Sequence, residues 1–277
     1  MKKMLSSLAA ATGLVALLSN QNLQARDAFP TQGLADYWSF NEDRGNTVYD
    51  STTNDNTGVL SSGAKWTRGK NDSGLNFNGT SGYVSLSQLP TTETSDFSIF
   101  AWVKDKSSTG NRQSIISYGS ATENPIELAD PYESLYLSLN NKNQLQFDLA
   151  DVNGPVGPKK MKDGLWYNVG VVNHNGNIQL YIDGTPDGNP MAMTPDIIRG
   201  YQTIGASYGN GQYGSFFNGK IDEVGVWDRA LNGNEISELY NCGKGNFYNP
   251  ECTPEPSTLA LMALAGAGAM ALKRKKK

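Results

Sequence analysis

Histidine and cysteine are scarce in this chain, which has one histidine and two cysteines among 277 residues. A zinc site needs three or four His, Cys or acidic ligands, and Ser-His-Asp or Cys-His catalysis needs a histidine beside the nucleophile. The sole histidine, His174, falls in a polar Asn173 to Gly176 turn, where we expect a solvated side chain rather than a general base. Hydrolase chemistry based on histidine or a thiol therefore lacks the residues it requires.

Uninterrupted apolar runs of about 20 residues, the length that spans a bilayer, are also missing. The first run, Leu8 to Leu18, follows the basic pair Lys2 and Lys3 and stops at a polar stretch, residues 19–22. This pattern predicts a secretory signal peptide over residues 1–25, cleaved after Ala25, rather than a membrane anchor. The protein is then exported.

The second apolar run, Leu259 to Leu272, carries no charge and is followed by five basic residues, 273–277. As a helix it would be about 21 Å long against a hydrocarbon core of about 30 Å, so it predicts only a transient anchor in the inner membrane. The basic end stays on the cytoplasmic side and leaves the rest of the chain outside.

A tripeptide, Pro254-Glu255-Pro256, precedes this apolar run. The order of tripeptide, apolar run and basic end over residues 254–277 closely resembles the PEP-CTERM sorting signal of bacteria that make exopolysaccharide. The resemblance implies that a membrane protease, exosortase, recognises the tripeptide and removes the tail, so that the product reaches the cell surface or the extracellular space. The alternative is an ordinary tail anchor with an accidental tripeptide.

Positive charge is scarce in the part that folds. Of the 23 Lys and Arg residues, two lie in the expected signal peptide, residues 1–25, and five in the C-terminal tail, residues 254–277. The tail also holds one of the 27 acidic residues. The remaining 16 basic and 26 acidic side chains give a net charge near −10. Nucleic acid and anionic membranes bind clustered Lys and Arg, so neither is an expected partner. An acidic domain suits calcium, or simply solubility.

The two cysteines, Cys242 and Cys252, lie ten positions apart, and an exported chain meets an oxidising compartment. We expect a disulfide that closes a C-terminal loop, residues 242–253, and stabilises the end of the domain by less than about 3 kcal/mol. A redox-active pair is disfavoured because the C-x-x-C spacing is absent.

Strand patterns dominate the middle of the chain. The segment "FSIFAWVK", residues 97–104, is apolar on both faces, and residues 134–150 and 166–184 each read as two alternating segments around a polar turn, which predicts two hairpins. Only "NGNEISELYN", residues 232–241, has helical spacing, with Asn234 as a candidate N-cap. Many short strands predict an all-β, two-sheet antiparallel jelly-roll sandwich with a short C-terminal apolar helix.

The order of motifs adds a family resemblance. The segments "LADYWSFNEDRGNTVYDSTTNDNTGVL", "GLNFNGTSGYVSL" and "FFNGKIDEVGVWDRALNGNEI" look like the laminin-G-like, concanavalin A-like jelly roll of many secreted bacterial proteins. The likeness covers about residues 33–241 and implies one such domain over residues 26–241. It implies little about function, because this fold hosts lectins, carbohydrate-binding modules, glycosidases and adhesion modules.

A catalytic carboxylate pair is not evident. Retaining glucanases with this architecture carry their two carboxylates at alternate positions of one strand, about 5 Å apart on one face. Here Asp222 and Glu223 are adjacent, so a regular strand would point them to opposite faces. We therefore assign no catalytic residue and expect a protein that is not an enzyme.

Calcium is the metal that the resemblance implies, through an early acidic or amide loop and the aspartate of the late "GKIDE" segment. Carried over by position, the candidate ligands are Asn41, Glu42, Asp50 and Asp222. The alternative is that Asp222 accepts hydrogen bonds from backbone amides at a strand end and that Asp50 forms an Asx turn with Ser51 and Thr52.

Sugar binding calls for exposed aromatic faces beside amides and carboxylates. Two segments offer them, and the candidate ligand-binding residues are Tyr132, Tyr208, Asn210, Gln212 and Tyr213. Most other aromatic residues, such as Trp38, Trp102, Trp166 and Trp227, fall on strand patterns and are expected in the core.

Three functions remain open. The first is an exported module that binds exopolysaccharide, surface glycan or protein without catalysis, and it fits the tail, the fold and the lack of a catalytic pair best. The second is a structural matrix component without a small ligand. The third is a glycosidase or lyase that degrades polysaccharide.

Overall fold

The structure is a computed structural model that describes residues 30–87, 96–106, 110–119, 135–149, 152–193, 201–209 and 212–240. The expected signal peptide, the disulfide between Cys242 and Cys252, the sorting tripeptide and the apolar segment 259–272 lie outside these residues. Within them no helix is long and apolar enough to cross a membrane.

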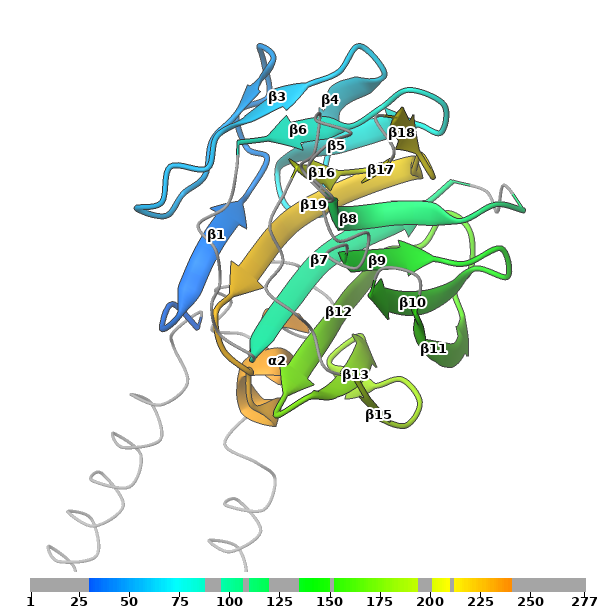
Figure 1. The fold of residues 1–277 in the computed structure, drawn as a ribbon. Coiled ribbons are helices and arrows are strands. Elements are labelled where there is room, and N and C mark those ends of the chain that lie inside the picture. The colour runs from blue at the N-terminus through cyan, green and yellow to red at the C-terminus, as the bar shows by residue number, and fades with distance from the viewer. Residues whose placement is uncertain are drawn as a thin grey trace, which may run out of the picture. The chain divides into compact units, whose positions relative to one another are not determined.

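The described residues form two large antiparallel sheets, as the strand patterns predict (Figure 1). One sheet has nine strands in the order β14-β13-β12-β7-β19-β5-β4, with β1 also paired to β19 and β15 to β13. Its strands are β1 (Leu34–Trp38), β4 (Ala64–Arg68), β5 (Ser73–Asn78), β7 (Phe97–Asp105), β12 (Tyr167–His174), β13 (Asn177–Ile182), β14 (Thr185–Pro186), β15 (Met191–Ala192) and β19 (Asn218–Trp227).

The other large sheet has eight strands in the order β11-β10-β9-β8-β16-β6-β3-β2. Its strands are β2 (Thr47–Val48), β3 (Gly58–Leu60), β6 (Val84–Leu86), β8 (Gln113–Gly119), β9 (Leu135–Leu139), β10 (Gln144–Leu149), β11 (Val152–Lys160) and β16 (Tyr201–Ile204). A separate hairpin pairs β17 (Ser207–Gly209) with β18 (Gln212–Gly214).

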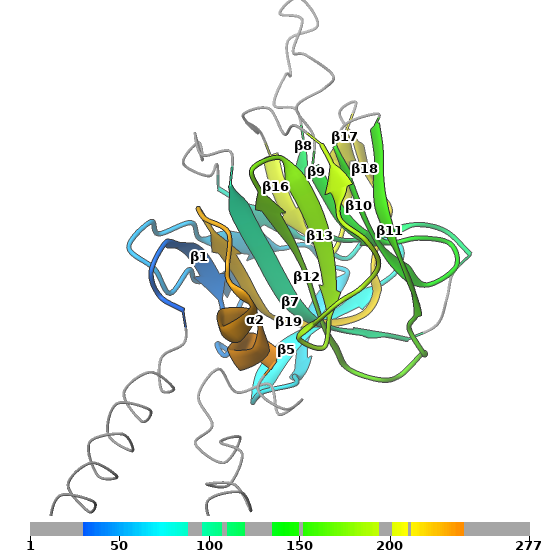
Figure 2. The same cartoon turned by 90° about the horizontal axis from the view of Figure 1, so that it is seen from below.

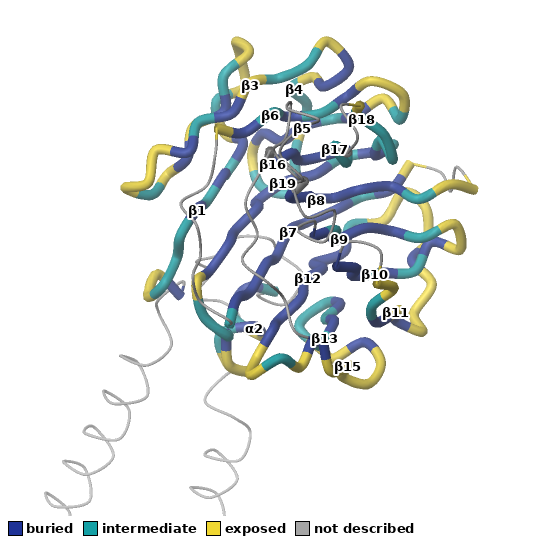
Figure 3. The backbone as a smooth tube through the Cα atoms, in the orientation of Figure 1, coloured by how far each residue is buried: buried dark blue, intermediate teal, exposed yellow. Residues whose placement is uncertain are grey.

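The main core lies between the two sheets, because alternate residues of their strands point inward and form one buried apolar cluster. The central strands are buried along most of their length, whereas the connections between strands are exposed (Figure 3). Of the tryptophans expected in the core, Trp38, Trp102 and Trp227 are buried, and Trp166 is half-buried.

Both expected hairpins are confirmed. β9 pairs with β10 from Leu139–Leu145 to Leu135–Leu149, and β12 pairs with β13 up to His174–Asn177. The second hairpin therefore turns on only two residues, Asn175 and Gly176, both with positive φ (51° and 72°). That is the backbone of a type I′ turn, whose twist matches the flanking strands.

The helix α2 (Gly233–Tyr240) packs on part of the outer face of the nine-stranded sheet, near β7 and β19 (Figure 2). Tyr240 stacks on Trp102 with ring centroids 5.9 Å apart, and Phe100 meets Trp227 edge to face at 6.3 Å. Strand β7 is thus apolar on both faces, as its sequence predicts, because one face packs on the main core and the other on aromatic side chains and α2.

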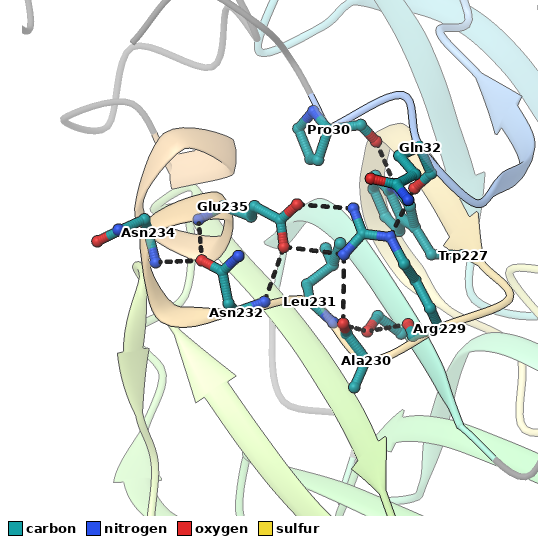
Figure 4. A network of polar contacts seen from close by, with 10 residues as sticks. Pro30, Gln32, Trp227, Arg229, Ala230, Leu231, Asn232, Asn234 and Glu235 are labelled. Carbon is teal, nitrogen blue, oxygen red and sulfur yellow. Dashed lines mark hydrogen bonds and ion pairs between the residues drawn. The ribbon is translucent and has the colours of Figure 1, made fainter. Parts of the chain in front are cut away.

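The start of α2 departs from the expectation. Asn232, not Asn234, is the N-cap: its Oδ1 accepts hydrogen bonds from the backbone N–H groups of Asn234 and Glu235 (Figure 4). The Glu235 carboxylate accepts the Asn232 N–H in return, which completes a capping box. Asn234 lies inside the helix, so its expected role was wrong.

A network of polar contacts connects α2 to the beginning and end of the sandwich (Figure 4). Arg229 pairs with Glu235 at 2.6 Å, and its Nε donates to the carbonyl of Gln32 at 2.7 Å. Since β1 and β19 also pair directly, the two ends of the domain are neighbours, as expected for a jelly roll.

Candidate functional site: the outer face of the eight-stranded sheet

The outer face of the eight-stranded sheet carries polar and aromatic side chains. On β9, Leu135, Leu137 and Leu139 join the core, so Tyr136 between them points away from it. On β10 the same alternation places Gln146 and Asp148 on the outer face. The Arg112 guanidinium forms an ion pair with Asp148 and lies 5.9 Å from the Tyr136 ring centroid.

Asp148 is held firmly in this patch. Its Oδ1 accepts a hydrogen bond from the Gly154 N–H at 2.9 Å, and the Gln146 amide donates to the same carboxylate. Burial lowers the pKa of the Arg112 guanidinium, and the neighbouring Tyr136 opposes this lowering. The patch therefore offers one cation, one amide and one aromatic ring on a fixed frame.

A second group of aromatic residues lies over the same outer face, and we call Tyr83, Tyr208 and Tyr213 the tyrosine cluster. Tyr213 stacks on Tyr83 with ring centroids 3.9 Å apart and an interplanar angle of 17°, and Tyr208 lies across the β17–β18 hairpin at 4.8 Å and 59°. All three rings are half-buried, and Gln212 beside them is exposed.

The β17–β18 hairpin lies over the outer face because Ala206, the residue just before it, is hydrogen-bonded to outward-pointing side chains of the sheet. Ile116 and Ile204 belong to the core, so the neighbouring Ser117 and Thr203 point outward, and both hydroxyls donate to the Ala206 carbonyl just before β17. Strands β17 and β8 are accordingly close in the view of Figure 1. The tyrosine cluster thus sits on a rigid support at the outer face.

Three of the five ligand-binding residues expected from the sequence, Tyr208, Gln212 and Tyr213, are brought together on this hairpin. Tyr132 and Asn210 lie outside the described residues. Sequence reasoning missed Tyr83, which comes from a segment about 130 positions away, and the Arg112–Tyr136 contact. The alternation of "GYVSL", in which Tyr83 and Ser85 oppose the core residues Val84 and Leu86, is the signal that could have placed Tyr83 on the polar face.

Asp222 and Glu223 do not follow the expected alternation. The register between β19 and β7 shifts between Asp222 and Gly225, and Glu223 has a φ of 52°, so a β-bulge interrupts the strand. Both carboxylates consequently bind Asn71: its N–H donates to Asp222 and its side-chain amide to Glu223. The expectation of opposite faces was wrong because it assumed a regular strand.

This acidic pair is buried and hydrogen-bonded. Asp222 accepts the Lys70 N–H at 2.7 Å, and Glu223 accepts the Tyr37 hydroxyl. Burial raises the pKa of Asp222 to about 8 and the pKa of Glu223 to about 7, against the lowering effect of these hydrogen bonds. Burial and the charge of Glu223 raise the pKa of Tyr37, so its hydroxyl remains a donor.

Each of the four expected calcium ligands accepts a hydrogen bond from a backbone N–H group of the chain. Asn41 Oδ1 accepts the Ser73 N–H, and Glu42 Oε1 accepts the Tyr49 N–H at 2.7 Å. Asp50 accepts the N–H groups of Tyr37 and Thr52, which is the Asx turn named as the alternative, and Asp222 binds backbone amides. Across the described ranges no three His, Cys, Asp or Glu side chains form a metal-binding group. Calcium at Asn41, Glu42, Asp50 and Asp222 stays a prediction.

A family model described as the concanavalin A-like lectin/glucanases superfamily matches residues 78–237, more than half of the chain. The chain belongs to this superfamily. A PEP-CTERM protein-sorting motif matches residues 253–275, which makes it an exported protein that is processed by exosortase toward the cell surface or the extracellular space. No curated protein sequence matches the chain.

Solved structures with a similar fold include a Trypanosoma rangeli sialidase in complex with 2,3-difluorosialic acid, with 19% identity and a TM-score of 0.57 over 77% of this chain and 33% of that one. Domain 4 of AbnA, a GH43 extracellular arabinanase from Geobacillus stearothermophilus in complex with arabinotriose, matches with 18% identity and a TM-score of 0.55, over 75% of this chain and 98% of that one. The chain spans about a third of the sialidase. At these identities the likeness concerns the fold alone.

Proposed function

We propose that the domain of this exported superfamily member binds carbohydrate without catalysis, through the tyrosine cluster on the outer face of its eight-stranded sheet. The observation that carries the proposal is the stacking of Tyr83 on Tyr213 with Tyr208 beside them, all three partly open to solvent. Apolar sugar faces stack on such rings, and Gln212 supplies an amide for the hydroxyl groups.

The comparisons are consistent with this proposal. Domain 4 of the arabinanase, which matches this chain over nearly its whole length, was solved in complex with arabinotriose. The sialidase complexes share the same sandwich within a longer chain. Both are proteins that act on or bind sugars, which favours glycan over nucleic acid as the ligand.

The acidic pair supports a role without catalysis. Asp222 and Glu223 are nearly inaccessible to solvent, and both accept hydrogen bonds from the chain itself. A general acid and a nucleophile must reach a glycosidic bond, and these groups point into the protein.

The test is a glycan-binding screen on the secreted protein, followed by titration of the best ligand. Replacing Tyr213 with Ala removes the ring that contacts both other tyrosines, and we expect the affinity to fall by about tenfold, or about 1.4 kcal/mol. Tyr213→Phe keeps the ring and should keep most of the affinity.

Tyr49→Ala provides the matched control, because Tyr49 is the most exposed large hydrophobic side chain among the described residues and lies beside β2, outside the cluster. Its affinity should equal that of the wild type. Turnover of any polysaccharide, or equal losses in Tyr213→Ala and Tyr49→Ala, would contradict the proposal.

A further inference from the structure

Asp36 lies in the interior of the sandwich. It is fully buried on β1, between Ala35 and Tyr37. Tyr37 turns outward to Glu223, whereas Trp38 joins the core, so Asp36 alternates with Tyr37 and points inward. A carboxylate in this position replaces the apolar side chain that a strand normally directs into a core.

Neither oxygen of Asp36 accepts a hydrogen bond of normal geometry from the described residues, although Asp50 and Asn56 lie close to it. Asp50 is also buried and approaches from the loop after β2, held by the N–H groups of Tyr37, Thr52 and Asn56. Thr52 Oγ1 lies within reach of both Asp50 and the Ala35 carbonyl, and its single proton can serve only one of them.

Among the described residues, no cationic side chain forms an ion pair with either of these two carboxylates. Across the described residues, the ion pairs involve other acidic groups, and the polar side chains near Asp36 are Asn56 and Tyr118, with Gln202 bound to Asn56. Two acidic groups buried together are costly unless one of them takes up a proton or a positive charge joins them. Burial and the charge of Asp50 raise the pKa of Asp36 to about 7, so a bound cation would replace that proton. Because the protein is exported, it meets extracellular cations.

We propose that Asp36 and Asp50 together hold a divalent metal ion of the calcium class inside the sandwich. The ligand chemistry selects the metal: the groups around Asp36 are carboxylates and amides, which calcium prefers, and they include no imidazole or thiolate for zinc or copper. This site differs from the one that the family resemblance implies, because Asp36 and not Asp222 is the partner of Asp50.

The ion would have a structural task. Asp36 belongs to β1 of the nine-stranded sheet, while Asn56, hydrogen-bonded to Asp50, binds Gln202 on β16 of the eight-stranded sheet. A cation between Asp36 and Asp50 therefore connects the edge of one sheet to the other through side chains. Its effect is expected on stability, independently of glycan binding.

The test uses the full secreted protein, treated with chelator and then titrated with calcium chloride. Saturating calcium should raise the melting temperature by about 5 °C or more. Asp36→Asn should lower the calcium affinity at least tenfold and, because it removes an uncompensated charge, should leave the chelated protein as stable as the wild type or more so. Asp222→Asn is the matched control and should respond to calcium as the wild type does.

Terbium gives a second readout in the wild type, because Trp38 lies two residues after Asp36 on β1 and Tyr118 lies near enough to Asp36 to be affected by its charge. Both are aromatic groups that can sensitise terbium emission. The emission should appear, be displaced by calcium, and be lost in Asp50→Asn, which keeps the test decisive if Asp36→Asn does not fold. A wild type without a calcium response, an Asp36→Asn protein that responds fully, or a response lost only in Asp222→Asn would overturn the proposal.

Discussion

A single residue, Glu223, has both an unusual backbone conformation and an unusually high pKa. A φ of 52° is rare for a side chain with a Cβ, and here it accompanies the bulge that turns Glu223 toward Tyr37 and Asn71. The bulge places two carboxylates over one loop, residues 69–72, and binds that loop to β1. Strain in the strand is thus offset by hydrogen bonds between distant segments.

The raised pKa of Glu223 predicts a pH-dependent stability. Its pKa is about 7 in the folded state against an ordinary 4.5, so the folded protein holds this proton more tightly than the unfolded chain does. The free energy of unfolding should therefore fall as the pH rises from about 4.5 to 7 and then level off. Glu223→Gln should reduce that fall by on the order of 2 kcal/mol.

Urea unfolding at pH 5 and pH 8, followed by both fluorescence and circular dichroism, measures this difference. Asp222, with a pKa of about 8, contributes a loss of the same sign that persists in Glu223→Gln. An unchanged difference between the two pH values in Glu223→Gln would show that Glu223 titrates normally.

Among the elements, the helix α2 offers a matched pair of substitutions. Asn232 caps two backbone N–H groups, whereas Asn234 donates its backbone N–H and has no capping role. Asn232→Ala should lower the free energy of unfolding by about 1 kcal/mol, and Asn234→Ala should change it by less than about 0.5 kcal/mol. Equal losses in thermal or urea unfolding would contradict the assignment of the cap.

The elements also show what a sequence can and cannot predict. Alternation was sufficient for β7 and for the hairpins around Asn175–Gly176 and residues 140–143, because each pattern repeats locally. Alternation failed at Glu223, because a β-bulge depends on the partner strand. The helix N-cap was assigned to Asn234 and not to Asn232, because an asparagine lies on each side of the helix start. Tyr83 was missed since only the folded chain brings it to Tyr213.

For the molecule as a whole, processing follows from the sorting motif over residues 253–275. The mature protein from the cell surface or medium should lack the basic end, residues 273–277, and its intact mass measures this. Glu255→Ala leaves the apolar run and its charges unchanged and should trap the precursor. A mature species that still carries Lys277, or normal processing of the Glu255→Ala protein, would show that the processing protease does not recognise the tripeptide.

We propose that the exported sandwich binds glycan through the tyrosine cluster. Co-sedimentation of the processed protein with the exopolysaccharide of the producing cells tests it most directly, with the wild type compared to Tyr208→Ala/Tyr213→Ala. We expect that the wild type sediments with the polysaccharide and that the double variant, folded as judged by circular dichroism, stays in solution. Equal sedimentation of both proteins, or of neither, would contradict it.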